Sequence, residues 1–192
     1  MALTFSNFTL KLGDTAPDFS LPDGHGELQH LSDLKGERGT VVFFACNHCP
    51  YVIRLVEGIR DFANEMVKQG IATIAISSND IENYPADAPD KMVTFAAESG
   101  WNFPYLYDES QEVAQAYDAT CTPDFFLFDA EGKLSYAGRF DATERGSDDP
   151  VTGAELRAAV ETLLTGKSAG HGEPSSGCGI KWKPENEPTQ LV

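Results

Sequence analysis

Apolar and polar positions follow two different periods along the chain, and these periods predict a succession of strands and helices. Residues 40–45 form a β-branched and aromatic run without charge, which is typical of a buried strand. Apolar residues then recur at helical spacing from 52 to 67, and Gly70 follows as a helix stop. Residues 71–77 are again β-branched and predict a strand covered on both faces. This strand, helix and strand predict a right-handed unit with parallel strands.

The second half of the chain continues the alternation and predicts an α/β protein. The predicted elements are a helix at 91–98 stopped by Gly100, a strand at 103–107, a helix at 109–117, a hairpin of strands 125–128 and 134–137, and a helix at 152–164. Ahead of the first strand, residues 12–34 are broken by proline and glycine. They predict a lead-in that packs on the core and contributes one short edge strand.

Two parts of the chain are expected, a domain at 1–165 that includes the lead-in and a C-terminal tail at 166–192. The tail is rich in Gly, Ser, Pro and Lys, and this composition predicts an extended or mobile segment. Within it, Cys178, Ile180 and Trp182 form a small apolar stretch able to lie back on the domain.

Composition and charge narrow the function classes. A chain of 192 residues with 41% hydrophobic content suits one domain with a sizeable core. The net charge is −16, and between residues 80 and 131 there are 12 acidic side chains against Lys91 alone. A negative field of this kind repels nucleic acid and anionic membranes, so neither is expected as a partner. Two interpretations stay open, a solvated acidic face and a surface for a basic protein.

The N-terminal residues and the cysteine content bear on location. Residues 1–10 carry no basic side chain and interrupt their apolar positions with polar ones, so they predict neither a secretory signal nor a membrane span. A cytoplasmic location is therefore expected. Four cysteines in 192 residues are too few for a disulfide-stapled scaffold, and we expect them to serve chemistry more than structure.

The segment Cys46-Asn47-His48-Cys49-Pro50 lies at the predicted junction of a strand and a helix. Backbone N–H groups and the helix dipole at a helix start favour a thiolate, and they lower its pKa below the usual value of about 8.5. A reactive dithiol is the first interpretation. The alternatives are half of a zinc site or two inert buried residues. No second C-x-x-C or H-x-x-x-H accompanies the motif, which favours redox chemistry.

The order of these elements resembles the thioredoxin fold, because a C-x-x-C motif opens a helix and Thr122-Pro123 precedes the hairpin. The lead-in at 13–21 and the insertion before residue 103 resemble the peroxiredoxin and thiol-reductase branch of that superfamily. More narrowly, the chain is similar to peroxiredoxin-like thioredoxin family proteins related to alkyl hydroperoxide reductase and thiol-specific antioxidant. Four motifs carry this similarity: residues 46–51, 121–127, 138–139 and 177–183. It implies a three-layer α/β/α fold with a mixed central sheet, an N-terminal extension and a peroxiredoxin-like insertion.

The resemblance also implies roles for individual residues. Cys46, expected to be nearer the helix start and more accessible, would attack, and Cys49 would resolve the mixed disulfide. Pro123 would follow a cis peptide bond, and Thr122 would offer its backbone to a substrate strand.

The residues between the cysteines are expected to tune the redox couple. A protonated His48 would stabilise the Cys46 thiolate and make the site more oxidising, and Asn47 would donate a further hydrogen bond. The alternative for His48 is a solvated loop histidine. Thr40 stands where thioredoxin has a buried aspartate. The proton acceptor is therefore left among water, Glu57 and His48.

Cys121 and Cys178 are possible accessory redox residues. Cys121 lies two residues before Pro123, so it is expected either at the rim of the site or as a buried small residue. Cys178, in the tail, is expected to reach Cys46 or Cys121 as a resolving thiol, and Lys181 nearby would favour its thiolate.

Three functions follow from these residues. The first is a thiol–disulfide oxidoreductase that uses Cys46 and Cys49, binds no cofactor and takes electrons from a protein dithiol reductant. The second is a thiol peroxidase, although Cys46 and Val42 stand where peroxiredoxins place Thr and Pro in P-x-x-x-T-x-x-C. The third is a Zn or Cu(I) binding module built from Cys46, Cys49 and either His48 or Cys121. The oligomeric state is left open.

Overall fold

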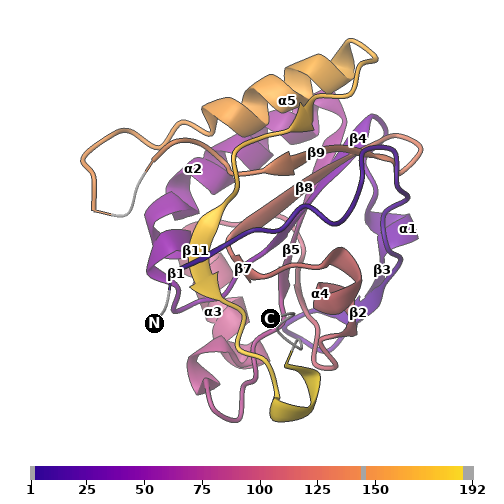
Figure 1. The fold of residues 1–192 in the computed structure, drawn as a ribbon. Helices are drawn as coiled ribbons and strands as arrows, with labels where there is room; N and C mark the ends of the chain where they lie inside the picture. The colour runs from indigo at the N-terminus through magenta and orange to yellow at the C-terminus, as the bar shows by residue number, and fades with distance from the viewer. Residues whose placement is uncertain (1–2, 144–145, 188–192) are drawn as a thin grey trace.

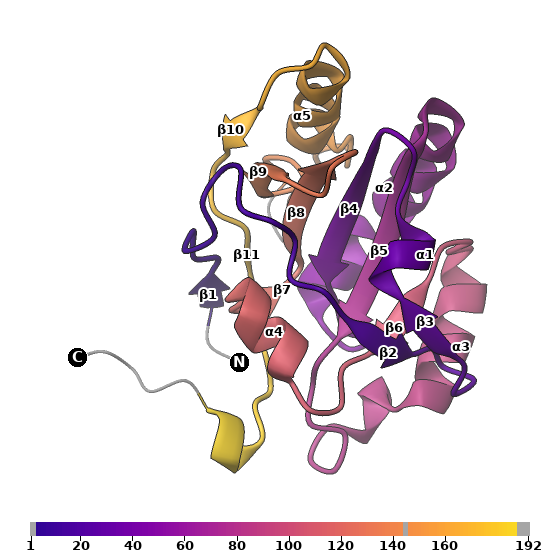
Figure 2. The same ribbon diagram turned by 90° about the vertical axis from the view of Figure 1, so that its right-hand side faces the viewer.

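The computed structural model describes residues 3–143 and 146–187, and it has the three-layer α/β/α arrangement expected from the sequence (Figure 1). The middle layer is a six-stranded mixed sheet with the order β10-β9-β8-β4-β5-β6. Across the sheet these strands are β10 (Gly170–His171), β9 (Leu134–Gly138), β8 (Asp124–Asp129), β4 (Gly39–Phe44), β5 (Ile71–Ser77) and β6 (Tyr105–Tyr107). Helices and the N-terminal segment cover its two faces (Figure 2).

The strand that leads into the C-x-x-C motif, β4, is the centre of the sheet. It runs parallel to β5 and antiparallel to β8, which is why the sheet is mixed. Successive side chains point to opposite faces, so Val41 and Phe43 join one core while Val42 and Phe44 join the other. Burial on both faces explains the uninterrupted apolar run in the sequence.

Three helices cover the first face: α2 (Pro50–Met66), α3 (Pro89–Ser99) and α5 (Ala154–Leu164). The helix predicted after the motif is confirmed, and a 3₁₀ turn, η1 (Val67–Gln69), extends it to Gly70. Gly70 has a φ of 81°, the left-handed conformation that ends helices and that glycine adopts without strain. A second glycine, Gly100, ends α3 in the same way.

The second face is covered by the N-terminal extension and by α4 (Glu112–Tyr117). The extension contains β2 (Ser20–Pro22), β3 (Leu28–His30) and α1 (Leu31–Leu34), and β2 pairs antiparallel with β3. Tyr117 is fully buried here, and its hydroxyl donates a hydrogen bond of 3.0 Å to the carbonyl of Pro17. The predicted lead-in is therefore a packed layer of the fold.

The helix predicted at 109–117 is shorter than expected because Asp108 organises its start. The Asp108 carboxylate accepts the backbone N–H groups of Val113 and Ala114, at 3.5 and 2.9 Å. Gln111, just ahead of the helix, has a φ of 64°, so the backbone turns there before it becomes helical. A carboxylate that holds orphan N–H groups in this manner sets where a helix begins.

Of the two alternatives for the C-terminal segment, the structure has the extended one, with the apolar stretch packed on the domain, and not the mobile one. Strand β10 extends the six-stranded sheet, and β11 (Ser176–Gly179) lies between β1 (Leu3–Phe5) and β7 (Cys121–Thr122) in a second sheet. Its apolar residues supply the reason, because Cys178 and Ile180 are buried. A further turn, η3 (Pro184–Asn186), follows, and residues 188–192 lie outside the described part. The boundary proposed at 165/166 stays a prediction.

The insertion between β5 and β6 holds a 3₁₀ turn, η2 (Pro85–Asp87), followed by α3. It brings Asp87 beside the C-x-x-C motif. None of the described helices has the length and apolarity needed to cross a bilayer.

Candidate active site

The two cysteines of the motif lie at the junction of β4 and α2, as the sequence predicts. Helix α2 begins at Pro50, with Cys49 as its N-cap residue. Proline suits the first helical position because its missing N–H would have no partner there, so the helix starts only after the second cysteine. Cys49, and not Cys46, is therefore next to the helix start. Accessibility does not distinguish the two thiols, since both residues are buried, at 1% and 0% exposed.

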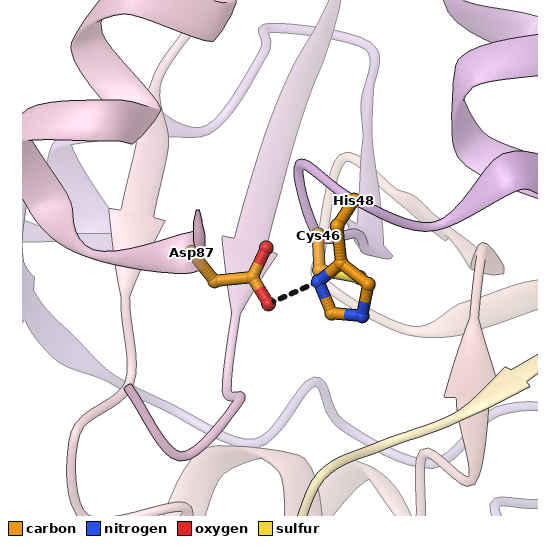
Figure 3. A group of neighbouring side chains, drawn as sticks. All are labelled: Cys46, His48 and Asp87. Atoms are coloured by element: carbon orange, nitrogen blue, oxygen red, sulfur yellow. Dashed lines mark ion pairs between the residues drawn. The ribbon is translucent and has the colours of Figure 1, made fainter. Parts of the chain in front are cut away.

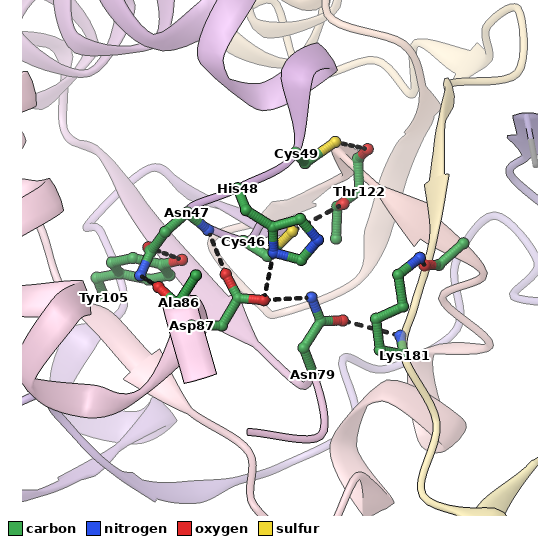
Figure 4. Close-up of polar contacts among 11 residues, drawn as sticks. Cys46, Asn47, His48, Cys49, Asn79, Ala86, Asp87, Tyr105, Thr122 and Lys181 are labelled. Atoms are coloured by element: carbon green, nitrogen blue, oxygen red, sulfur yellow. Dashed lines mark hydrogen bonds and ion pairs between the residues drawn. The ribbon is translucent and has the colours of Figure 1, made fainter. Parts of the chain in front are cut away.

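The loop before β8 lies directly against both sulfur atoms. The Thr122–Pro123 peptide bond is cis, as the resemblance implies. The Cys46 Sγ lies 3.5 Å from the Thr122 hydroxyl, and the Cys49 thiol donates to the Thr122 carbonyl at 3.1 Å (Figure 4). Thr122 thus holds both thiols of the motif in place.

The pKa values of the two thiols are shifted in opposite directions, so that when the pair holds a single proton, this proton stays on Cys46. Hydrogen bonding from the Cys46 thiol lowers the pKa of Cys49 to about 5, against the opposing effect of burial. The side chain of Thr122 and the backbone N–H groups of Val52 and Cys178 favour the same thiolate. The pKa of Cys46 is raised by that same hydrogen bond, then by burial and by the charge of Asp87. When the pair loses one proton, these partners favour the negative charge on Cys49, and the hydrogen bond that the Cys49 thiol donates to the Thr122 carbonyl is then given up.

Asp87 is a fully buried carboxylate beside the motif (Figure 3). Its Oδ1 accepts the backbone N–H of Asn47 at 2.8 Å, and its Oδ2 accepts the side-chain amide of Asn79 at 2.8 Å. The Nδ1 of His48 lies 2.7 Å from the same Oδ2 in an ion-pair contact. Buried charges are normally paired and hydrogen-bonded. For Asp87, two residues of the C-x-x-C motif, Asn47 and His48, supply these partners.

His48 is held in a defined place and is not the solvated loop residue of the alternative interpretation. Its ring stacks on Tyr84 at 5.7 Å between centroids and faces Asp87, and its two ring nitrogens are buried. The atoms of Cys46, His48 and Asp87 that bind metals or protons lie within 4.8 Å of one another. His48 therefore links the dithiol to a buried carboxylate.

Asn47 makes its side-chain hydrogen bonds away from the sulfurs. Its amide donates to the Ala86 carbonyl at 2.9 Å, and its Oδ1 accepts the Tyr105 hydroxyl at 3.0 Å. The expected hydrogen bond to the redox couple is replaced by a contact that fixes the motif to the 85–87 turn and to β6. Asn47 positions the loop that carries Cys46.

Sequence reasoning missed Asp87 and Asn79 as parts of the site. Asp87 lies between Pro85 and Pro89 in a segment without a helical or strand pattern, and nothing local indicates its contact with a motif 40 residues earlier. A weak signal was present, because an aspartate among Ala and Pro has few polar neighbours to pair with in its own segment. Asn79 in turn accepts the backbone N–H of Lys181 at 2.9 Å, which ties the site to the C-terminal segment.

The two remaining cysteines are buried beside the cis-proline loop. The Cys121 thiol points toward the carbonyls of Pro123 and Ser175, and burial raises its pKa well above the usual range. This agrees with the alternative of a buried small residue at that position. Cys178 lies in β11 opposite Thr122, so the expectation that it moves with a mobile tail is wrong.

Within the described residues, one group offers three metal-ligating side chains close together, namely Cys46, His48 and Asp87 (Figure 3). Thiolate, imidazole and carboxylate are ligand types that suit Zn²⁺. Cys49 and Cys121, which the metal-binding interpretation also used, are not in this group. Asp87 Oδ1 accepts one hydrogen bond and keeps a second lone pair, whereas Oδ2 is met by both Asn79 and His48, so a metal bound at Oδ2 would have to displace one of these two contacts.

A small pocket of about 160 Å³ opens next to Pro123. It is lined by Tyr51, Arg54, Arg139 and Phe140, among others. Arg139 pairs with Glu155 at 2.8 Å, so part of its charge is already neutralised.

Comparison with known proteins places this geometry among thiol redox proteins. The model of the AhpC/TSA family matches residues 12–137. The peroxiredoxin Bcp of Escherichia coli is 33% identical over 139 residues, which cover 66% of this chain and 84% of that protein. The thiol-disulfide oxidoreductase ResA of Bacillus subtilis is 29% identical over 128 residues, which cover 64% of each chain.

Solved structures agree on the fold. An uncharacterized conserved protein from Geobacillus kaustophilus superimposes with a TM-score of 0.91 and 45% identity, covering 96% of this chain and 98% of that one. Peroxidoxin BcpB from Mycobacterium tuberculosis superimposes with a TM-score of 0.60 and 24% identity, covering 81% and 97%. These structural similarities confirm the predicted thioredoxin fold, and the matches to the AhpC/TSA family and to peroxiredoxin Bcp confirm the redox character of the chain.

Proposed function

The chain belongs to the AhpC/TSA family, and on that premise we propose that it is a thiol–disulfide oxidoreductase in which Cys46 and Cys49 alternate between dithiol and disulfide. The observation that carries the proposal is the contact of both sulfurs with Thr122, while the two thiols share one proton. Two thiols held against one residue are ready to form a disulfide with each other. A low-pKa thiolate in a dithiol motif is the form that reacts in thiol–disulfide exchange.

The proposed reaction starts from the Cys49 thiolate. It attacks one sulfur of a substrate disulfide, and the other substrate sulfur leaves as a thiolate that takes up a proton. Cys46 then loses its own proton and attacks the Cys49 sulfur, which releases the second substrate thiol and leaves the Cys46–Cys49 disulfide. We assign His48 as the acceptor of the Cys46 proton, since it lies beside that thiol and faces Asp87.

This order reverses the roles that the resemblance assigns to the two cysteines, and mixed-disulfide trapping distinguishes the two orders. The probe is a small aromatic disulfide, and both variants also carry Cys178→Ser, so that no third thiol beside Cys49 can release the probe. In this background Cys46→Ser should retain a mixed disulfide on Cys49, whereas Cys49→Ser should form no mixed disulfide at a comparable rate. A trapped species on Cys46 alone would restore the order implied by the resemblance. Slow attack by both variants and by the unsubstituted protein would overturn the dithiol function itself.

A second function, thiol peroxidase, is favoured by the place of Cys49. Cys49 caps α2 and takes the position of the cysteine in the peroxiredoxin motif, and the E. coli relative carries the name peroxiredoxin. Cys46 stands where that motif has Thr, and its thiol supplies a hydrogen bond to Cys49 as a hydroxyl would. Attack on hydrogen peroxide would give a sulfenic acid on Cys49 and one water. Condensation with Cys46 would then give the disulfide and a second water.

Rapid quenching separates these two functions. Reduced, chelator-treated protein is mixed with one equivalent of hydrogen peroxide, and all four cysteines are mapped by mass spectrometry over time. Oxidation of Cys49 far faster than a free thiol supports the peroxidase. Slow oxidation by peroxide together with fast oxidation by a protein disulfide supports exchange. Metal content before chelation tests the metal-binding alternative in the same preparation.

We also propose which classes of molecule the protein reacts with and where in the cell it acts. The reductant is a protein dithiol, and the substrate is a disulfide or a peroxide. The acidic chain, at −16 net charge, disfavours nucleic acid as a partner. A cytoplasmic location stays part of the proposal, and fractionation of cells that express the tagged chain tests it.

A further inference from the structure

Strand β11 lies across the cis-proline loop, at the edge where a substrate strand was expected. Cys178 pairs with Thr122 and Gly179 pairs with Cys121, both antiparallel. Strand β1 pairs with the other edge of β11, so β11 has a neighbour on each side (Figure 1). The backbone of Thr122 is therefore already engaged by the chain's own segment.

The close approach of β11 to the cis-proline loop requires glycine at position 177. A Cβ atom added to Gly177 would lie 2.0 Å from the carbonyl oxygen of Thr122 and 2.7 Å from its carbonyl carbon. Both are backbone atoms of a loop that also holds the two sulfurs, so they have little freedom to move away. Any other residue at 177 would lift this strand from the loop. Gly177 therefore sets the position of Cys178.

Cys178 lies against the reactive pair. Its partner Thr122 is the residue whose carbonyl contacts the Cys49 sulfur at 3.1 Å. The backbone N–H of Cys178 itself reaches the Cys49 sulfur, and Cys178 packs in the same buried cluster as Cys46 and Cys49. Because Cβ is two bonds from the backbone nitrogen, the Cys178 side chain begins near the Cys49 sulfur, and rotation about χ1 changes where its own sulfur lies.

Contacts on both sides hold β11 in this place. On one side, Ser175 donates two hydrogen bonds, from its N–H to the Ser6 hydroxyl at 2.8 Å and from its hydroxyl to the Gly138 carbonyl at 3.2 Å. On the other side, the Lys181 carbonyl accepts the backbone N–H of Asp80 and the side-chain amide of Gln111, at 2.8 and 2.9 Å. A thiol fixed in this way reacts at a high effective concentration.

We propose that Cys178 is a third redox thiol and the internal exchange partner of Cys49, a step that rests on the proposed dithiol function. The Cys178 thiolate attacks the Cys49 sulfur of the Cys46–Cys49 disulfide. A Cys49–Cys178 disulfide forms, the Cys46–Cys49 bond breaks, and Cys46 leaves as a thiolate that takes the proton lost by Cys178. No electrons enter or leave in this step, so the protein dithiol reductant acts afterwards on either disulfide.

The same geometry disfavours Cys121 as the partner. Its sulfur points toward the carbonyls of Pro123 and Ser175, at 3.6 and 3.9 Å, and not toward the dithiol. In the register of β7 and β11, Cys121 faces Gly179, which carries no side chain. The proposal therefore specifies one disulfide out of the possible pairings, Cys49–Cys178.

The test uses the full chain with Cys46→Ser, which leaves Cys49, Cys121 and Cys178. The protein is equilibrated in buffers of oxidised and reduced dithiothreitol, acid-quenched, and its disulfides are mapped by mass spectrometry. We expect Cys49–Cys178 to exceed Cys49–Cys121 by about tenfold or more, because a disulfide formed away from its preferred geometry is strained and more easily reduced. An excess of Cys49–Cys121, or the absence of any intramolecular disulfide, overturns the proposal.

Two glycine variants in the same background separate geometry from general destabilisation. Gly177→Ala should reduce the Cys49–Cys178 fraction about tenfold, since its Cβ meets backbone. Gly179→Ala is the matched control, because its Cβ would meet the Thr4 hydroxyl at 3.0 Å, and the nearest backbone atom, the Thr120 carbonyl oxygen, lies at an ordinary contact distance of 3.9 Å. Equal effects of the two substitutions contradict the proposed fit of β11.

The unsubstituted chain distinguishes failure of this inference from failure of the proposed function. In the same dithiothreitol buffers it should form Cys46–Cys49, with Cys49–Cys178 as a second species. Loss of the Cys46–Cys49 disulfide would count against the dithiol function. Suppose that the unsubstituted chain forms Cys46–Cys49, but neither it nor Cys46→Ser forms Cys49–Cys178. That result would contradict only the proposed role of Cys178 and would leave the dithiol function standing.

Discussion

At the scale of single residues, the site depends on which atom carries each proton. The Cys49 sulfur accepts hydrogen bonds from several directions, whereas Cys46 faces the Cys49 sulfur and the Asp87 carboxylate. Burial opposes ionisation of both thiols, so the difference between them comes from their hydrogen-bond partners. Neighbouring side chains, and not exposure, select the thiolate.

The first prediction concerns the pH dependence of Cys49 alkylation. A pKa lowered to about 5 means that the thiolate is present above that pH, so the alkylation rate should rise through pH 5 and be flat above about 7. Cys46→Ala removes the largest stabilising hydrogen bond and should move the midpoint upward. Iodoacetamide labelling followed by peptide mapping measures both proteins. A midpoint near 8.5 in the unsubstituted protein would contradict the assignment of the charge.

Asp124 is a second buried carboxyl, and its environment is the opposite of that of Asp87. It is 1% exposed, its Oδ2 has no hydrogen-bond partner, and burial raises its pKa well above the usual range. The nearby charge of Asp118 acts in the same direction. A group that must keep its proton in the folded chain makes stability depend on pH.

The second prediction follows from the sign of this shift. The contribution of the Asp124 proton to stability is fully present below about pH 4 and declines as the pH rises toward the folded-state pKa. Asp124→Asn removes the titration, so its free energy of unfolding should improve relative to the unsubstituted protein by about 1.4 kcal/mol per pH unit in that window. Urea unfolding at pH 5, 6 and 7 measures the difference. Parallel pH profiles would rule out a raised pKa.

At the scale of elements, β4, β5, α2 and the β8–β9 hairpin could be predicted because each has a strong local pattern. The strands have β-branched or aromatic runs, and α2 has a long apolar stripe with Gly70 after it. Strands β1, β7 and β11 were missed because each has only two to four residues and depends on partners far away in the chain. No local period can appear in so short a segment.

The residues of the site also fall into two groups, those that could be predicted from neighbouring residues in the sequence and those that depend on contacts between distant segments. The C-x-x-C motif and Thr122-Pro123 could be recognised from sequence because their residues are adjacent. The contact between Asp87 and the motif depends on how the insertion folds back over β6, and the place of Cys178 depends on β11 pairing with β7. Composition suggested a mobile tail because it counts glycines, whereas Gly177 is there to permit a close contact.

The third prediction tests packing against helix propensity in α2. Alanine normally stabilises a helix interior by about 1 kcal/mol over glycine. At Gly58, however, an added Cβ would lie 2.4 Å from a methyl group of Val151 and 3.3 Å from the Phe140 ring. Gly58→Ala should therefore lower the free energy of unfolding by about 1–2 kcal/mol.

The control for this test introduces Gly58→Ala into a protein that also carries Val151→Ala, which lacks the methyl group that the new Cβ would meet. In it, Gly58→Ala should become neutral or stabilising by up to about 1 kcal/mol. Thermal and urea unfolding of the four proteins complete the cycle. Stabilisation by Gly58→Ala in the unsubstituted chain would show that the loop at Val151 yields freely.

At the scale of the whole molecule, the N-terminal and C-terminal segments complete one structure. Strand β11 is paired with β1 on one edge and β7 on the other, and β10 extends the main sheet beside β9. Phe8, Leu10 and Trp182 pack against the second core. The segment after residue 165 therefore contributes to the core as well as to the site.

The fourth prediction tests the boundary at 165/166. A chain of residues 1–165 loses β10 and β11, and with them buried side chains such as Ile180, each worth about 1.5–3 kcal/mol. It should melt at a lower temperature, and Cys46 and Cys49 should react faster with a thiol reagent under native conditions. A chain ending at residue 187 serves as the control. Equal melting temperatures and equal thiol reactivity would make 1–165 an independent domain.

The position of β11 also has a consequence for the newly made chain. Synthesis runs from the N-terminus, so the dithiol emerges long before the strand that covers it, because Ser176 is added 127 positions after Cys49. At about 5–20 residues per second, this interval lasts roughly 6–25 s. During that time the nascent chain carries Cys46 and Cys49 without β11 above them. Its vulnerability to oxidation on the ribosome is thus set by the rate of translation as well as by the redox poise of the cell.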